Sequence, residues 1–543
     1  MTRRERLMVL LVMGTGAALR FWGIQFGLPD DFARPDEEKL IGAALNILQG
    51  DPNPHFFLYP TLFIYVMSAA YAVLSGVERL AGATASRTDF VAQSIADPSM
   101  LHLTARLLAA AAGVATIPVL YSAVRRVSSA RAALMASGLL AVAFLHVRDS
   151  HFGVTDVPAT FLIVCAFRAA VLCATRGVTF PRVAAAGVWS GFAASTKYNA
   201  ALVALPAMTT IVSQFRTRTS LSRSAALLVV LFLCLGAAFL AGTPFALLDW
   251  RGFLTEFTIQ SRTAFGTHHG SILDAARAAV AERGWSHHLT FTLRHGLGLP
   301  LLSAGLTGAC WLIVARPPIA AIVLWFPVVF YAAMGASLLV YARWMVPMVP
   351  FLCMTAAMLV DRVADAAAHA SKRPRVAPIC VGALVALLGA GTLGRSIAFD
   401  RLMTRPDTRV LAARWIESRF PAGATLYQTG AVYGYVQPRP SDLYRLFTYD
   451  ERHHRFQGSS NPHRDLPDVI AVLDSPLVVF NHVPGDLPAI LDTHYHWVET
   501  FKGTITARVA EAVYDQQDAF YVPFANLDTI RRPGPDVRIF ERR

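Results

Sequence analysis

Twelve apolar segments of about the length that crosses a lipid bilayer are the feature that most restricts the fold of this chain. A spanning helix needs roughly 20 mostly apolar residues. The candidate segments lie near residues 7–25, 57–81, 101–123, 131–147, 157–175, 183–196, 198–215, 224–247, 297–315, 318–340, 341–360 and 376–397. Hydrophobic residues make up 54% of the chain and charged residues only 16%, unlike a soluble protein. We therefore predict an all-α polytopic membrane protein.

Basic residues gather in some of the short loops between these segments. Cytoplasmic loops of membrane proteins carry an excess of Lys and Arg. The loops assigned to the cytoplasm on this basis are Arg125 to Arg131, Arg176 to Arg182, Arg216 to Arg223 and Lys372 to Arg375. The first outer loop, 28–56, carries six acids against two bases. The N-terminus is then cytoplasmic, and everything after about residue 398 lies outside.

Three candidate segments precede Arg125, whereas a cytoplasmic N-terminus requires an even number of crossings. Segment 57–81 is broken early by Tyr59-Pro60 and adjoins a polar stretch at 82–100. We expect this segment to lie in the outer interface, or to dip into it, which leaves about eleven spans. No small-residue cleavage site closes the N-terminal apolar run, so we predict an uncleaved first span in a bacterial-type inner membrane.

A change of composition near residue 400 predicts two domains. Residues 1–398 form the transmembrane domain, with outer loops 28–100 and 248–296. Residues 399–543 are polar and contain short β-like runs at 424–427, 477–480 and 537–540, separated by Pro, Gly and Asp. This tail is long enough for a C-terminal extracytoplasmic α/β domain.

The positive charge of the chain does not indicate a nucleic-acid partner. Lys plus Arg outnumber Asp plus Glu by 49 to 36, but the excess lies mostly in loops between apolar runs. Aromatic residues do not alternate with basic clusters in a polar domain, as a nucleic-acid binder requires. No Gly-rich phosphate loop follows a strand, so no nucleotide cofactor is expected. The six cysteines all lie in apolar stretches and are read as core residues.

The first group of residues that could do chemistry is Arg34-Pro35-Asp36-Glu37-Glu38, which precedes an expected amphipathic helix at 37–49. These acids could be solvated signals of topology, or could favour the dipole of the helix that they begin. Alternatively, an apolar neighbourhood would raise the pKa of a carboxyl group and suit it to accept a proton from a hydroxyl.

The second group runs from His146 to Pro158 and includes Arg148, His151 and Asp156. Ionisable residues at that depth are costly unless they face a cavity or one another, so this density favours a functional site. A purely structural knot of ion pairs is the alternative. Two His and two Asp could also bind a divalent cation, although spacing alone does not establish one.

Two further cations lie at outer helix ends. Lys197 follows Ser195-Thr196, and Arg343 lies in Tyr341-Ala342-Arg343-Trp344. Lysine can serve as a point charge for a lipid phosphate, and arginine can bind phosphate oxygens in bidentate fashion. The plainer alternatives are a snorkelling lysine and an anchor in the aromatic belt.

At these positions the chain resembles the GT-C type glycosyltransferases, and among them the protein O-mannosyltransferases and the lipid A aminoarabinose transferases. The resemblance covers about residues 7–360. The segments that carry it are LRFWGIQFGLPDDFARPDEEKL (19–40), NPHFFLYPTLFIYV (53–66), ARLLAAAAGV (105–114), HVRDSHFGVTDVPATFL (146–162), ASTKYNAALVALP (194–206), GTPFALLD (242–249) and ARWMVPMVPFL (342–352).

The resemblance implies that Asp36, in an Asp-Glu pair with Glu37, is the catalytic base. The other matched positions are a second outer-loop acid, the lysine of a Thr-Lys motif, an arginine before a Pro-rich span and a histidine near Tyr59-Pro60, namely Asp156, Lys197, Arg343 and His55. These residues would hold a phosphate or a coordinating ion.

Transfer from a polyprenyl phosphate needs cations that stabilise the departing phosphate and a carboxylate that activates the acceptor. We therefore predict a glycosyltransferase that moves a sugar, with inversion, from a polyprenyl-phosphate donor to a lipid, glycan or protein acceptor outside the cytoplasm. Arg148, Lys197 and Arg343 would bind the donor phosphate. The groups expected to orient them, or to hold a possible divalent cation, are Asp156, His151 and His55.

Loop 248–296 is then expected to cover the site. Its pairs His268-His269 and His287-His288 are read as solvated loop residues.

A transporter or flippase of lipid-linked saccharides is the main rival hypothesis. Transporters place ionisable residues at mid-membrane and contain internal repeats, whereas here the ionisable residues cluster at outer helix ends and no repeat is evident. A third hypothesis is an assembly scaffold whose function resides in the tail after residue 400.

Overall fold

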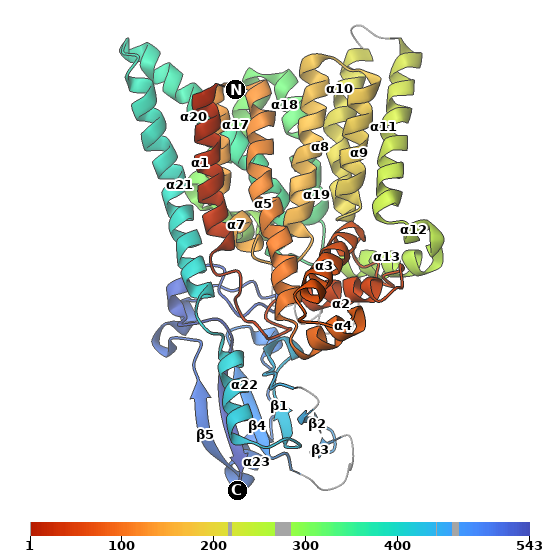
Figure 1. The fold of residues 1–543 in the computed structure, drawn as a ribbon. Helices are drawn as coiled ribbons and strands as arrows, with labels where there is room; N and C mark the ends of the chain where they lie inside the picture. The colour runs from red at the N-terminus through yellow and green to blue at the C-terminus, as the bar shows by residue number, and fades with distance from the viewer. Residues whose placement is uncertain (1, 216–219, 266–283, 441–442, 459–465) are drawn as a thin grey trace.

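The structure is a computed structural model that describes residues 2–215, 220–265, 284–440, 443–458 and 466–543. A bundle of long helices forms one part of the molecule, and a smaller domain with a β-sheet forms the other (Figure 1). The N-terminus lies at the free end of the bundle and the C-terminus at the far tip of the small domain. The predicted fold class, a helical membrane domain followed by a C-terminal α/β domain, is confirmed.

Each apolar segment coincides with one helix or with two consecutive helices. The helices of the bundle are α1 (Arg3–Phe21), α5 (Ser99–Val127), α6 (Ala130–Val142), α7 (Phe144–Asp149), α8 (Asp156–Arg176), α9 (Phe180–Ala194), η1 (Tyr198–Ala204), α10 (Leu205–Phe215), α11 (Leu221–Gly242), α17 (Leu299–Ala315), α18 (Pro317–Val323), α19 (Trp325–Gly335), η3 (Ala342–Met348), α20 (Val349–Ser371) and α21 (Val376–Met403). The predicted amphipathic helix at 37–49 is α2 (Glu37–Leu48).

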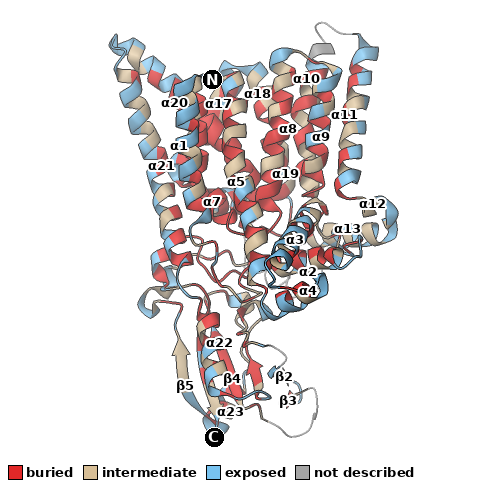
Figure 2. Cartoon of the chain, viewed as in Figure 1, coloured by how far each residue is buried: buried red, intermediate tan, exposed pale blue. Residues whose placement is uncertain are grey.

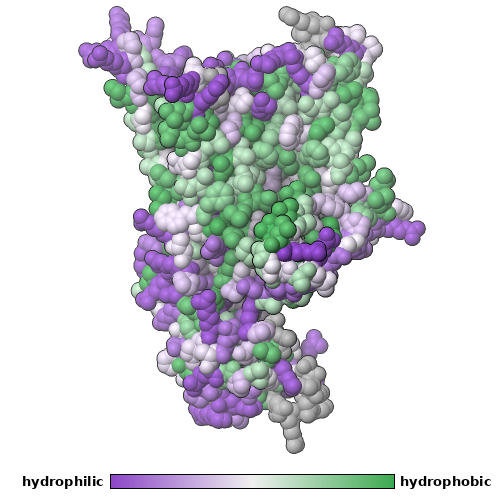
Figure 3. Space-filling view, in the orientation of Figure 1, coloured by the Kyte–Doolittle hydropathy of each residue, from purple (hydrophilic) through white to green (hydrophobic). Residues whose placement is uncertain are grey.

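Six of the described helices are long and apolar enough to cross a membrane, or eight if each of two bent helix pairs counts as one span. Figure 3 shows, on the face in view, a hydrophobic band across the bundle between two hydrophilic ends. The figure of eleven crossings stays a prediction. Helix α3 (Leu62–Leu80) lies at the lower end of the bundle beside α2 and α4 (Arg87–Ala96) in Figure 1, although its length and composition also suit a span.

Small residues allow the helices of the bundle to pack closely. A Cβ at Gly187 of α9 would lie 2.5 Å from the carbonyl oxygen of Leu231 in α11, and one at Gly191 would collide with the carbonyl oxygen of Leu235. Such positions let two backbones approach in a membrane, where dispersion contacts replace the hydrophobic effect. Buried residues fill the interior of the bundle, as Figure 2 shows.

The C-terminal domain contains a six-stranded mixed sheet with the order β3-β2-β1-β4-β6-β5. The strands are β1 (Thr425–Gln428), β2 (Arg445–Asp450), β3 (Arg455–Gln457), β4 (Val469–Asp474), β5 (Tyr495–Phe501) and β6 (Asp536–Arg542). Strand β1 runs parallel to β2 and β4, and the other pairs are antiparallel.

Alternate residues of β4 face the two helices of this domain. Val469 and Ala471 pack with α22 (Thr408–Arg419), whereas Ile470 and Val472 pack with α23 (Leu487–His494). This alternation follows from the two-residue period of a strand and explains why β4 is buried along nearly its whole length.

Two of the three β-like runs are strands, but the run at 477–480 is not. Residues Val478–Phe480 form a short 3₁₀ turn, η6, after β4. Pro476 cannot continue the ladder, and the Ser475 hydroxyl accepts a hydrogen bond from the Leu477 amide at 3.2 Å, which turns the chain. At the start of this domain, α21 continues to Met403, past the predicted boundary at 398.

Candidate functional site

Asp36 joins three segments of the chain at the lower end of the bundle. It precedes α2 with a φ of 73°, a left-handed conformation that Asp adopts more readily than most residues. Its Oδ2 accepts hydrogen bonds from Arg343 Nη2 at 2.6 Å and from the Tyr59 hydroxyl at 3.2 Å. Its Oδ1 accepts one from Lys39 Nζ at 3.0 Å. Residues 307 positions apart in the sequence therefore meet here.

The charges around Asp36 set the direction in which the pKa of its carboxyl group is shifted. Burial by itself would raise the pKa of this carboxyl group, but the Arg343 guanidinium and the Lys39 ammonium more than offset burial and hold the pKa well below its ordinary value. The expectation that an apolar neighbourhood raises the pKa of a carboxyl at 34–38 is therefore wrong for Asp36, whereas burial does raise the pKa of Glu38. The apolar surroundings exist, but two cations lie inside them.

Glu37 points away from this cluster, although it is the next residue. Its side chain is fully buried, and it accepts hydrogen bonds from Arg106 Nη2 at 2.7 Å and from the Gly153 amide at 2.7 Å. His102 Nδ1 lies 3.2 Å from its Oε2. Against the effect of burial, Arg106 and His102 lower the pKa of Glu37 to about 2. Glu37 thus fixes α2 to α5, and it lines neither of the two cavities described below.

Lys197 and Asp156 form a second buried pair. Asp156 is the first residue of α8, and Lys197 lies between α9 and η1. Lys197 Nζ donates a hydrogen bond to Asp156 Oδ1. The ammonium group does not reach bulk water by snorkelling, because the lysine is only 7% exposed.

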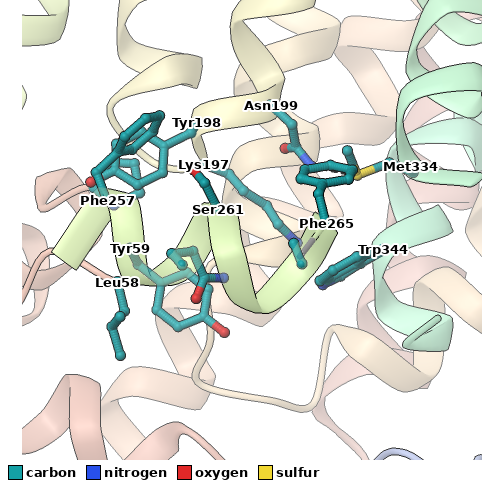
Figure 4. Close-up of a pocket in the computed structure, with 13 residues that line it drawn as sticks. Leu58, Tyr59, Lys197, Tyr198, Asn199, Phe257, Ser261, Phe265, Met334 and Trp344 are labelled. Atoms are coloured by element: carbon teal, nitrogen blue, oxygen red, sulfur yellow. Dashed lines mark hydrogen bonds between the residues drawn. The ribbon is translucent and has the colours of Figure 1, made fainter. Parts of the chain in front are cut away.

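Two cavities of different character adjoin the Asp36–Arg343 pair. The first, of about 180 Å³, has Tyr59 and Lys197 among mainly apolar and aromatic neighbours, and Figure 4 shows these side chains around it. Its other lining residues are Leu58, Pro60, Tyr198, Asn199, Phe257, Gln260, Ser261, Ala264, Phe265, Met334 and Trp344. Because Tyr59 lines this cavity and donates to Asp36, the first cavity reaches one side of the pair.

The second cavity, of about 360 Å³, has Asp36, Lys39 and Arg343 in its wall. The transmembrane domain also contributes Pro35 and Tyr341, and the C-terminal domain contributes Ala431, Val432, Tyr433, Phe480, Gln517, Asp518 and Ala519. This cavity therefore lies between the two domains.

The guanidinium of Arg343 has one nitrogen that donates a hydrogen bond to Asp36 and one that has no partner among the described residues. Nη2 donates to Asp36, but Nη1 is buried and has no hydrogen-bond partner among the described residues. The guanidinium lies 4.8 Å from the ring centroid of Tyr341. A further anion with at least one oxygen acceptor would satisfy the free N–H groups.

Residues of the C-terminal domain hold the segment that carries Arg343. Asp515 Oδ2 accepts a hydrogen bond from the Ala342 amide at 2.8 Å, and Gln517 Oε1 accepts one from the Val340 amide at 2.7 Å. Sequence reasoning missed both residues. The apolar run 519–525 that follows them in an otherwise polar tail is buried, and this run is the signal that could have shown that 515–518 packs inside the protein.

Arg148 lies deep in the protein and pairs with acids. Its Nη1 donates to Asp149 Oδ2 at 3.1 Å, and its Nη2 lies 4.0 Å from Asp518 Oδ2. Asp518 also accepts a 2.5 Å hydrogen bond from Arg34. Burial would raise the pKa of Asp518, but Arg34 and Arg343 hold it below its ordinary value. Arg148 lines neither of the two cavities.

The structure places the predicted histidines apart from Asp36. His151 Nε2 lies 2.9 Å from the carbonyl oxygen of Trp22 and 3.5 Å from Asp400 Oδ1, in a buried cluster beside α1 and α21. His55 is exposed and pairs with Asp51 at 2.9 Å.

The expectation of a solvated loop is wrong for His287 and His288. Both are buried, in α15 (Gly284–His287) and in the π-helical turn η2 (His288–Leu293), where Phe291 stacks on His287. The helical turn directs both rings into the protein. His268 and His269 lie outside the described residues.

The described side chains do not form a set of ligands for a metal ion. In residues 2–215, 220–265, 284–440, 443–458 and 466–543, no group of three or more His, Cys, Asp or Glu lies close enough to share an ion. The carboxylates of Asp36 and Asp156 are each neutralised by a cationic side chain of the protein itself.

The chain is similar to known membrane glycosyltransferases. A family model described as dolichyl-phosphate-mannose-protein mannosyltransferase matches residues 99–241, from the start of α5 to the last turn of α11. No curated protein matches the chain.

Solved structures share the fold at low sequence identity. ArnT from Cupriavidus metallidurans bound to undecaprenyl phosphate is 16% identical, with a TM-score of 0.54 over 99% of this chain and 97% of ArnT. The oligosaccharyltransferase AglB from Archaeoglobus fulgidus, in complex with an inhibitory peptide and a dolichol-phosphate, is 12% identical, with a TM-score of 0.51 over 81% of this chain. The match spans 64% of AglB. The expected resemblance is confirmed: the chain is a multi-pass membrane protein with the fold of the GT-C type membrane glycosyltransferases.

Proposed function

We propose that the protein is an inverting glycosyltransferase that takes a sugar from a polyprenyl-phosphate donor and attaches it to an acceptor at the end of the bundle that carries the C-terminal domain. The observation that carries this proposal is the Asp36–Arg343 pair between two cavities. A carboxylate and a cation in contact can serve the two halves of a transfer reaction, activation of the acceptor and stabilisation of the leaving phosphate.

The first cavity suits the donor. Its lining is mostly apolar and aromatic, as an isoprenoid chain requires, and Lys197 supplies a positive charge within it. Arg343 lies next in sequence to Trp344 of this cavity and keeps a free buried Nη1 for a phosphate oxygen. The ligands named for the two similar structures, undecaprenyl phosphate in ArnT and a dolichol-phosphate in AglB, support the same class of donor.

Asp36 is the proposed base, and donor binding would activate it. In the free protein Arg343 and Lys39 keep its pKa low, which makes it a weak base. A donor phosphate that binds Arg343 competes for the guanidinium and weakens its pair with Asp36. The effect of burial on the carboxyl then prevails and raises its pKa, so that its affinity for a proton rises when the donor is in place.

The proposed transfer takes place in a single displacement step. The acceptor hydroxyl in the second cavity gives its proton to Asp36, and its oxygen forms a bond to the anomeric carbon of the sugar. The bond from that carbon to the phosphate oxygen breaks, and polyprenyl phosphate leaves with the electron pair. Inversion requires that the acceptor oxygen attacks from the second cavity and that the phosphate departs into the first, on the opposite side of the anomeric carbon.

The other predicted residues act through these two. Asp156 positions Lys197, and Glu37 positions α2 and therefore Asp36. Arg148, predicted to bind the phosphate directly, acts through Asp518 and the segment around Arg343.

The proposed acceptor is a lipid, a glycan or a protein outside the cytoplasm. In the proposed orientation, the basic loops and the N-terminus lie on the cytoplasmic side. None of these steps uses a metal ion.

Release of radiolabelled sugar by the purified protein in lipid tests the proposal. The donors are polyprenyl-phosphate mannose, glucose and arabinose, and the variant is Asp36→Asn. We expect turnover with one donor in the wild type, its loss in Asp36→Asn, and retained donor binding by the variant. Asp51→Asn is the matched control, because Asp51 is an exposed acid of the same loop. Normal transfer by a folded Asp36→Asn protein contradicts the base assignment, and a wild type that binds none of the donors contradicts the donor class.

A further inference from the structure

A cavity of about 510 Å³ lies at the opposite end of the bundle from the candidate active site. It is formed by the ends of α1, α5 and α8, near the N-terminus in Figure 1. The residues that line it are Val9, Pro118, Tyr121, Ser122, Arg125, Arg126, Thr175 and Arg176. The proposed reaction uses none of them.

Several positive charges converge on this cavity. Arg125, Arg126 and Arg176 line it directly. Arg168 lies about two helical turns from Arg176 on the same helix and donates a 2.8 Å hydrogen bond to Ser122, which is also in the wall. The charges of Arg168 and Arg176 both act on Arg126. Like charges held together near the apolar bilayer cost free energy unless an anion joins them.

The protein itself compensates these charges only in part. Arg125 Nε lies 3.9 Å from Glu5 Oε1, beyond hydrogen-bond distance, and Glu5 also forms the N-terminal cap of α1 with Thr2. The Arg126 Nε is buried and has no hydrogen-bond partner among the described residues. A basic loop that only marks the cytoplasmic side needs neither a shared cavity nor hydroxyl groups beside the arginines.

We propose that this cavity binds the phosphate group of an anionic lipid. The arginines are donors for phosphate oxygens, and so is the Ser122 hydroxyl, which accepts a hydrogen bond from Arg168 and keeps its own hydrogen. Basic pockets between transmembrane helices at the cytoplasmic side are suited to anionic headgroups. The apolar part of the wall, Val9 and Pro118, provides a surface for an acyl chain, which free phosphate would not need.

The experiment compares the full-length protein in nanodiscs of phosphatidylcholine alone and with added phosphatidylglycerol. Its readouts are the melting temperature and the number of phosphatidylglycerol molecules retained in native mass spectrometry after transfer to detergent. The test variant is Arg126→Gln/Arg176→Gln, and the matched control is Arg373→Gln/Arg375→Gln, which removes two exposed charges from the loop before α21. A separate arm adds inorganic phosphate to the protein in phosphatidylcholine.

We expect phosphatidylglycerol to raise the melting temperature of the wild type and of the control but not of the test variant. Loss of two arginines should weaken retention by about 30-fold, from the usual contribution of a basic residue near an anionic surface. The single variant Arg176→Gln, at an exposed position, should weaken it about 5-fold and covers the case in which the double variant is unstable in phosphatidylcholine. Equal retention by wild type and test variants overturns the proposal. If inorganic phosphate raises the melting temperature as much as phosphatidylglycerol does, the proposal of a lipid ligand is overturned and the cavity is a site for free phosphate. Sugar transfer is not a readout, so this result is independent of the proposed enzymatic activity.

Discussion

Asp36 and Glu37 are adjacent acids whose surroundings give them different tasks. Asp36, in its left-handed conformation before the helix, faces Arg343 and a cavity, whereas Glu37 faces Arg106 inside the protein. Both have lowered pKa values, but Asp36 lines the cavity between the two domains, where a ligand can change its neighbours, and Glu37 does not line that cavity. The sequence motif identifies the two acids, but it does not show which of them faces a cavity and which is an anchor. Their partners, Arg106 and Arg343, are 69 and 307 residues away in the sequence.

The pH profile of Arg343→Gln tests the task of Asp36. The pKa of Asp36 lies below its ordinary value of 3.8 in the free wild type, so kcat/KM should show no acid limb from this group above about pH 4. In Arg343→Gln burial is opposed mainly by Lys39, the pKa rises, and an acid limb should move up into the measured range. The rate at neutral pH should fall about 100-fold or more, since a phosphate-binding cation is lost.

Arg401→Gln is the control for this experiment, because Arg401 is an exposed arginine near the end of α21. It should keep the wild-type profile. An unshifted acid limb in Arg343→Gln would show that the Arg343 charge does not govern Asp36.

At the scale of elements, the apolar pattern predicts the helices well because a bilayer imposes the length of each segment. It fails where local chemistry decides, as in the turn after Pro476 and in the buried helical turn at His287-His288. The position of α2 is a further case. Its amphipathic pattern predicts a surface helix, but the pattern does not show that Glu37 fixes the helix to Arg106 of α5.

Glu37→Gln should therefore lower stability. With a folded pKa of about 2 against an ordinary 4.5, the charged Glu37 contributes stability that is fully present above pH 4.5 and is lost as the pH falls toward 2. The shift corresponds to about 3 kcal/mol, and a glutamine also leaves Arg106 buried without a counter-charge. Thermal unfolding in detergent at pH 7 should show a clear loss for Glu37→Gln. Glu38→Gln, at the next and partly exposed position, should unfold close to the wild type, whereas equal unfolding of both variants would refute an anchoring role for Glu37.

At the scale of the whole molecule, the candidate site belongs to two domains. The composition of the tail predicts a separate α/β domain and the strands β1 and β6. Composition does not reveal that Asp515 and Gln517 accept hydrogen bonds from the backbone on either side of Tyr341, or that Asp518 holds Arg34. Contacts between a polar tail and a membrane domain do not repeat at a regular spacing in the sequence, so they are seen only in the folded structure.

The last prediction follows from these contacts. If the C-terminal domain only presented the acceptor, its variants would change acceptor KM and leave cleavage of the donor intact. Because Asp515 and Gln517 hold the segment of Arg343, we expect Asp515→Ala/Gln517→Ala to lower kcat for donor cleavage about 10-fold or more, since misplaced phosphate-binding groups lose much of their effect. Asp528→Ala, an exposed acid of the same domain, should leave donor cleavage unchanged. A double variant that alters only acceptor KM would assign the C-terminal domain to acceptor binding alone. A fall in the kcat of donor cleavage, both with the acceptor and with water in its place, would make this domain part of the catalytic framework.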